Sequence, residues 1–149
     1  MTVDVDRDAQ VVVEHTTLIN APLDTVWRLH TTIGDWPSWQ PDITSAALDG
    51  PLVPGSSFRW ETSGLDITST IKEVVPGERI VWGGPARGID GVHVWAFTEG
   101  PDGVTVHTTE SWDGPPVAAD PGGMRAALDA SLVAWLAALR QAAENPSSR

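Results

Sequence analysis

The sequence predicts one α+β domain in which a curved antiparallel sheet of about seven strands wraps around a long C-terminal helix. Its 149 residues fit one domain, spanning 1–149, with a single core over residues 11–144. Short apolar segments alternate with Gly, Pro and Asp turns through the middle of the chain, which is typical of an antiparallel meander. The chain then ends in a segment whose large apolar residues recur at helical spacing.

The first elements are a strand and a short helical region. Residues 11–19 are β-branched and loosely alternating, which favours a strand. Pro22 favours a helix start, because proline is tolerated in a first helical turn. We expect a helix of about three turns there, ended by Gly34. A loop or short helical turn carrying Trp36 and Trp39 should follow.

Turn residues divide the middle of the chain into further strands. Ser63-Gly64 and the five residues 99–103 read as hairpin turns, and residues 113–116 should end the sheet. The glycine-rich segment 83–88 is predicted to be a mobile connector. The strands expected between these turns are 43–48, 57–62, 65–75, 79–82, 92–98 and 104–112.

The C-terminal segment is the clearest helix. Asp120 is placed to cap it, and Pro121 fits its first turn. Its apolar stripe must lie against the meander, since no other large partner exists in the chain. We expect both termini to be short frayed tails. The stripe consists of Leu128, Leu132, Trp135, Leu136 and Leu139.

The composition excludes several classes of function. Nine Lys and Arg against 20 Asp and Glu leave a net charge of −11, which disfavours nucleic acid and anionic membranes as partners. The absence of cysteine excludes disulfides and thiolate metal sites. The four histidines lack metal-ligand spacing, and no nucleotide-binding fingerprint is present, so we expect neither metal nor cofactor. The first residues lack signal-peptide character, which favours a cytoplasmic protein. An oligomer is left open.

Alternation assigns side chains to the two faces of the sheet. Arg59 and Glu61 should face solvent, which turns Phe58 and Trp60 inward. The same rule places further side chains on the inner face: Ser69, Trp82, Thr108, Glu110 and Trp112.

The inner and outer faces of one strand can be assigned in two ways. Over residues 92–98, one face carries two valines and an alanine, and the other carries His93, Trp95 and Phe97. We place the second set inward, because an outward Trp95 and Phe97 would form an exposed apolar stripe. His93 and Glu110 would then meet on the concave side of two neighbouring strands.

This pair is the candidate catalytic chemistry. A carboxyl group in an apolar pocket resists ionisation, and a nearby imidazole can exchange a proton with it. His93 and Glu110 could therefore move a proton or hold a carbonyl oxygen, as aldol cyclisation requires. The alternative, which the sequence leaves open, is that the two side chains only satisfy one another.

Four stretches carry a resemblance to a known family. They are INAPLDTVW at 19–27, WPSWQP at 36–41, VPGERIVW at 75–82 and TESWDG at 109–114. With the element order, they resemble the START-like (SRPBCC) superfamily, specifically its polyketide cyclase/dehydratase-like branch. The resemblance covers about residues 11–144 and implies the helix-grip fold, with a deep pocket between the sheet and the last helix.

The resemblance also implies a hydrophobic small-molecule ligand, such as a polyketide-like or polycyclic substrate. The protein would be a cofactor-independent cyclase or dehydratase, or alternatively a carrier of a hydrophobic ligand or lipid that catalyses nothing. A protein-interaction domain is a third reading. Cyclases of this branch commonly use tyrosine and arginine, whereas this chain has no tyrosine, and only Arg87 is left open as a pocket arginine. A purely structural role for all eight tryptophans also stays open. The residues expected to line the pocket are Trp60, Trp82, Trp95, Trp112, Ser69, Phe58, Leu132 and Trp135.

Overall fold

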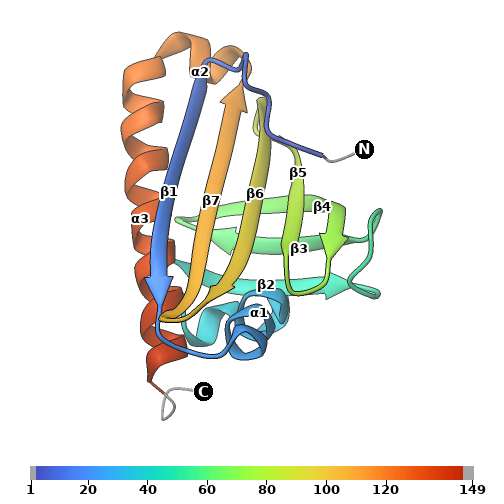
Figure 1. Cartoon of the computed structure of the whole chain (residues 1–149). Coiled ribbons are helices and arrows are strands. Elements are labelled where there is room, and N and C mark those ends of the chain that lie inside the picture. Colours follow the sequence, from blue (N-terminus) through green and yellow to red (C-terminus); the bar gives the residue numbers. More distant parts are fainter. Residues whose placement is uncertain (1–2, 146–149) are drawn as a thin grey trace.

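A computed structural model describes residues 3–145 and has the predicted α+β architecture (Figure 1). Seven strands form one antiparallel sheet in the order β1-β7-β6-β5-β4-β3-β2. The strands are β1 (Val11–Ile19), β2 (Ile43–Asp49), β3 (Ser57–Thr62), β4 (Leu65–Val75), β5 (Arg79–Ala86), β6 (Ile89–Gly100) and β7 (Gly103–Asp113). The helices are α1 (Leu23–Thr31), the 3-10 helix η1 (Ile33–Ser38), α2 (Pro115–Ala119) and α3 (Pro121–Glu144).

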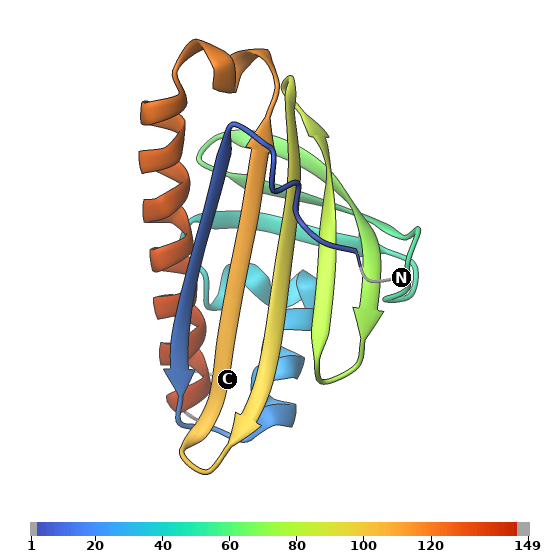
Figure 2. The same ribbon diagram turned by 45° about the horizontal axis from the view of Figure 1, so that its top comes forward.

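The sheet curls around its contents. In Figures 1 and 2, β1, β7 and β6 run side by side while β2 and β3 cross at a steep angle to them, and α3 runs alongside β1. Helix α1 and η1 lie at the end of the sheet where β1 finishes (Figure 1). This arrangement is the helix-grip architecture, so the fold prediction is confirmed.

The strand register confirms the predicted faces. Trp82 lies opposite His93, His93 opposite Glu110, and Glu110 opposite Val13. These side chains therefore form one row across the inner face, because directly opposed residues point to the same side of a sheet. His93, Trp95 and Phe97 are all buried, as the inward assignment required.

The prediction of a mobile connector over residues 83–88 is wrong. Strand β5 continues to Ala86, and only Arg87 and Gly88, both with positive φ, turn the chain into β6. Gly83 is needed for close strand approach rather than for mobility, because a Cβ there would meet the Gly91 carbonyl oxygen at 2.3 Å. Gly34 likewise lies inside η1 instead of ending a helix.

The N-terminal segment is not a frayed tail. Val5 is buried against Val81 and Val94 on the outer face of the sheet, with Val3 packed beside it. Arg79 ties the segment down by donating to the Val3 carbonyl oxygen. Residues 3–8 therefore cross the convex face of the sheet, and we call this segment the strap. The corresponding expectation for the C-terminal tail falls on residues 146–149, outside the described residues.

Helix α3 begins as predicted, with the Asp120 carboxylate accepting a hydrogen bond from the Gly123 N–H at 3.1 Å. It is also, among residues 3–145, the one helix long and apolar enough to cross a membrane by length and composition. That is weak evidence for a membrane span, because the core helix of a soluble protein passes the same test. One face of α3 buries Leu132, Trp135 and Leu139.

Candidate functional site

The two candidate catalytic residues meet. His93 in β6 and Glu110 in β7 are directly paired across the sheet, and His93 Nδ1 lies 3.1 Å from Glu110 Oε1. The His93 side chain is 4% exposed and that of Glu110 is 18% exposed, so part of the Glu110 side chain reaches solvent. A proton could therefore pass between the pair and a small molecule that reaches the carboxyl group.

Hydrogen bonds around His93 indicate where its proton lies. The Thr108 hydroxyl donates to the Val94 carbonyl oxygen at 3.1 Å, which uses its single hydrogen. It must then accept from His93 Nε2, which is 2.7 Å away. Burial lowers the pKa of His93, and the repulsion that would arise if nearby His30 were also protonated lowers it further, so the ring is neutral and Nδ1 is an acceptor.

The proton between His93 and Glu110 consequently resides on the carboxyl group. Burial raises the pKa of Glu110 to about 7, against an opposing hydrogen bond from Trp112. That bond runs from Trp112 Nε1 to Oε2 over 2.8 Å, which leaves Oε1 for His93. Near neutral pH, Glu110 is thus present in both its acidic and basic forms, as general acid–base catalysis requires.

A second buried imidazole adjoins this pair, and the sequence did not identify it as a site residue. His30 of α1 is fully buried, with its ring centroid 4.2 Å from that of Trp95 and 5.4 Å from that of Trp82. Burial lowers the pKa of His30 to about 3, so this ring is neutral. The signal was its position four residues after Val26, on the apolar stripe of the predicted helix.

Most of the predicted pocket residues gather in one aromatic cluster. Its rings are in mutual contact rather than facing an open hollow; those of Trp95 and Trp135, for example, lie 5.5 Å apart. Ser69 accepts a hydrogen bond from Trp60 Nε1 at 3.1 Å, at the margin of this group. We use the name aromatic cluster for His30, Trp36, Phe58, Trp60, Trp82, His93, Trp95, Phe97 and Trp135.

Two predicted pocket residues lie elsewhere. Leu132 belongs to a second apolar group near α2, with Val11, Val117 and Leu128, and Trp112 packs against it. Trp112 therefore orients Glu110 from the side of the second group instead of sharing a wall with Trp60. Alternation placed Trp112 on the correct face, but it could not show where along the sheet the inner space divides.

Several buried polar atoms stand out. Within the described residues, five such side-chain atoms lack a hydrogen-bond partner. Four of them belong to the aromatic cluster: His30 Nδ1, His30 Nε2, Trp95 Nε1 and Trp135 Nε1. We call these four the polar core atoms. The fifth is Trp39 Nε1, directly after η1.

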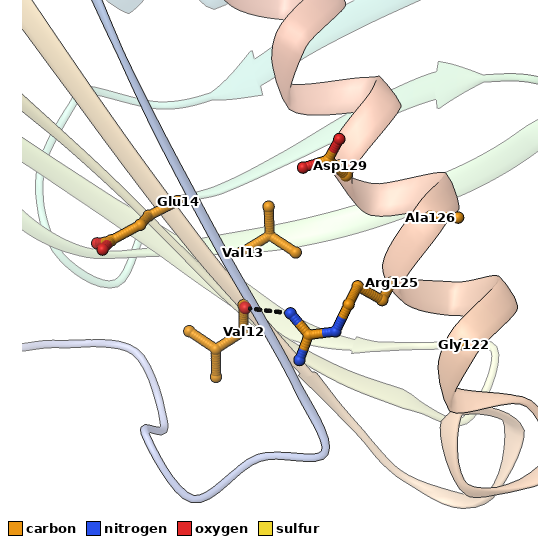
Figure 3. A pocket seen from close by; sticks show the side chains of 7 residues that line it. All are labelled: Val12, Val13, Glu14, Gly122, Arg125, Ala126 and Asp129. Carbon is orange, nitrogen blue, oxygen red and sulfur yellow. Dashed lines mark hydrogen bonds between the residues drawn. The ribbon is translucent and has the colours of Figure 1, made fainter.

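Two surface hollows lie along the seam between β1 and α3. The one in Figure 3, with a volume of about 410 Å³, is lined by Val13, Arg125 and Asp129 among others. Arg125 donates to the Val12 carbonyl oxygen at 3.0 Å, which ties α3 to the edge strand. Neither hollow touches His93 or Glu110.

The other two histidines have local roles. His15 Nε2 lies 2.7 Å from Asp129 across the β1–α3 seam, while the half-exposed His107 lies 3.2 Å from Glu14 on the surface. Arg59 faces solvent, as predicted. Across residues 3–145, no group of three His, Asp or Glu side chains is placed to hold a metal ion.

Comparison with known sequences gives one family. The model of a family described as "Polyketide cyclase / dehydrase and lipid transport" matches residues 10–144, which is most of the chain. No curated protein matches the sequence.

Solved structures resemble this fold closely at low sequence identity. A hypothetical protein from Helicobacter pylori superimposes with a TM-score of 0.81 at 17% identity, covering 96% of this chain and 98% of its own. A START superfamily protein from Mycobacterium smegmatis gives 0.75 at 17% identity, with 89% and 97% covered. The di-domain ARO/CYC protein StfQ of the steffimycin biosynthetic pathway gives 0.74 at 18% identity, and the match covers 93% of this chain but 52% of StfQ.

Proposed function

This chain belongs to the polyketide cyclase/dehydrase and lipid transport family, and from that premise we propose a cofactor-independent cyclase- or dehydratase-like activity. The ligand would be a hydrophobic, polyketide-like or polycyclic molecule that lies against the aromatic cluster. His93 and Glu110 would be the catalytic pair, and the cytoplasm would be the site of action.

One observation carries this proposal: a carboxyl group and an imidazole lie within hydrogen-bond distance of each other on the inner face of the sheet. Their separation is 3.1 Å, and the Glu110 pKa of about 7 keeps both protonation states populated. Ionised Glu110 can take a proton from the carbon beside a ligand carbonyl. The resulting enolate forms a carbon–carbon bond to a second carbonyl carbon, whose oxygen then takes the proton back. Loss of water completes a dehydration.

The aromatic cluster supports a planar ligand. Indole rings present flat apolar faces, and stacked or edge-on ring pairs contribute about 0.5–1.5 kcal/mol each beyond burial. A polycyclic molecule can replace ring contacts with similar ones when side chains move apart. Trp60, at the margin of the cluster and partly exposed, is the side chain best placed to move.

A carrier without catalysis is the second candidate. It is favoured by the complete internal pairing of His93, which already uses Glu110 and Thr108 as partners. A histidine whose two ring nitrogens both have protein partners can have a purely structural role.

Deuterium exchange separates the two functions without knowledge of the natural substrate. The probe is 2-tetralone in D₂O, whose exchange beside the carbonyl is followed by proton NMR. We expect Glu110→Gln and His93→Ala to lower the protein-catalysed exchange about 100-fold, the usual contribution of a positioned acid or base. His107→Ala, at the surface, is the matched control. Binding of the probe with no catalysed exchange would favour the carrier, and exchange unchanged in both variants would remove the acid–base pair.

A further inference from the structure

The polar core atoms are costly features of an otherwise apolar region. Leaving a buried donor or acceptor unsatisfied costs about 1–3 kcal/mol per group, and such groups in native proteins call for an explanation. His30 is 0% exposed, Trp95 0% and Trp135 4%, so bulk water does not reach these groups. Phenylalanine at each position would keep an aromatic ring without a polar atom to satisfy.

The three side chains converge from different elements. His30 comes from α1, Trp95 from β6 and Trp135 from α3. The Trp95 ring is central, with centroids 4.2 Å from His30 and 5.5 Å from Trp135. Two indoles supply one donor each, and a neutral imidazole supplies one donor and one acceptor. Together they supply three donors and one acceptor, which is the complement of a ligand carbonyl oxygen with a hydroxyl beside it.

The charged side chains near the aromatic cluster restrict which chemical class of ligand can bind there. Among residues 3–145 no Lys or Arg side chain is buried, so a carboxylate or phosphate buried in the aromatic cluster would lack a countercharge. A neutral carbonyl oxygen accepts hydrogen bonds without that cost. The His93 ring lies 4.8 Å from that of Trp95 and 5.7 Å from that of Trp135, so such a carbonyl lies beside the catalytic pair.

We propose that Trp95 Nε1, Trp135 Nε1 and the His30 ring bind the carbonyl oxygen of a neutral polycyclic ketone. This inference rests on the proposed function, because it requires a hydrophobic ligand in the aromatic cluster. It makes the site selective for ketones over hydrocarbons of the same shape. It also turns the carbon beside the carbonyl toward His93 and Glu110.

The test compares 9-fluorenone with fluorene, two planar tricyclic probes that differ by one carbonyl oxygen. Calorimetric titration of the whole protein should give about tenfold tighter binding of fluorenone, the value of one good hydrogen bond in a buried site. Trp95→Phe and Trp135→Phe should each lower this preference about fivefold. Trp39→Phe is the matched control, since Trp39 Nε1 is also buried without a partner but Trp39 lies outside the aromatic cluster. Its preference should match that of the wild type.

A second measurement needs no variant. In the ¹⁵N-labelled wild type, fluorenone should shift the indole N–H signals of Trp95 and Trp135 downfield, and fluorene should not. Equal binding of the two probes with unshifted signals would overturn this inference and leave the proposed function standing. A ketone preference that persists in both tryptophan variants would also overturn it. Failure of both probes to bind would overturn the inference and the proposed function together.

Discussion

Glu110 is held between two opposing influences. Burial raises its pKa to about 7, and the hydrogen bond from Trp112 Nε1 counteracts part of that rise. The protonated carboxyl group also suits its neighbour, because His93 Nδ1 is an acceptor when Thr108 holds Nε2. Burial and the acceptor on His93 therefore favour the protonated carboxyl group, whereas the hydrogen bond from Trp112 favours the ionised one.

A pH-dependent stability follows from this shift. The folded pKa lies above the ordinary 4.5, so the folded state holds a proton that the unfolded chain releases, and stability falls as pH rises from about 4.5 through 7. Glu110→Gln keeps an N–H donor for His93 and cannot ionise. Relative to wild type, the variant should gain up to about 3 kcal/mol between pH 4 and pH 8. Urea unfolding at both pH values measures the gain.

The matched control is Glu61→Gln, at an exposed position on β3. Its difference from the wild type should be the same at the two pH values. A constant difference for Glu110→Gln as well would show that the Glu110 proton is not held as the geometry indicates.

The alternation of side chains along the strands predicted the His93–Glu110 pair but not the hydrogen bonds around it. A period of two places His93 and Glu110 on one face, and the hairpin of residues 99–103 makes them neighbours, so local pattern was sufficient. Thr108 was also placed inward, but its hydroxyl acquires a role only through the Val94 carbonyl oxygen of the neighbouring strand. His30 was missed because a histidine on an apolar helix stripe reads as ordinary core until the absence of a protein partner for its ring nitrogens, among the described residues, is known.

At the scale of elements, the strap over residues 3–8 shows the limit of short patterns. Val3 and Val5 are too few to predict a contact, because the outer face that they cover exists only after β5, β6 and β7 assemble. Glycine was misread at 83–88 for a related reason. The residue that usually marks a loop also permits two strands to approach closely, and only the partner strand shows which applies.

The strap should contribute measurably to stability. Val5 is 6% exposed between Val81 and Val94, so Val5→Asp places a carboxylate against apolar side chains. We expect a loss of about 2–4 kcal/mol in the free energy of unfolding. Val53→Asp is the matched control, because Val53 is 44% exposed, and its effect should stay within about 0.5 kcal/mol. Equal effects of the two substitutions, measured by urea unfolding, would mean that the strap is not docked in solution.

Across the whole molecule, the interior divides into two parts with different contents. The aromatic cluster lies between α1, η1 and the curved sheet, and the second apolar group, which contains Leu132, lies near α2. Glu110 sits at their boundary, since its partners His93 and Trp112 belong to different parts. The fold class could be predicted because it depends on element order and on one amphipathic helix. The division of the interior could not, since it depends on how the sheet curves.

Buried ionisable groups in this interior give the molecule opposite responses to acid and base. The folded pKa of His30, about 3, lies below the ordinary 6.5, so the unfolded chain binds a proton that the folded state excludes. The stability that neutral His30 contributes is complete above pH 6.5 and is lost as pH falls toward 3. The stability that protonated Glu110 contributes is instead lost as pH rises. His93, with a lowered pKa, acts in the same direction as His30.

Acid sensitivity should therefore fall when the imidazole of His30 is removed. His30→Phe keeps a ring among Trp82, Trp95 and Phe97 but cannot bind a proton. Between pH 7 and pH 5 the wild type should lose about 2 kcal/mol more than the variant, in proportion to the pKa separation over that interval. Urea unfolding at both pH values measures the loss, with the surface substitution His107→Gln as control. Identical losses in wild type and His30→Phe would mean that water or another proton acceptor reaches the His30 ring in solution, because only a ring kept dry resists protonation at pH 5.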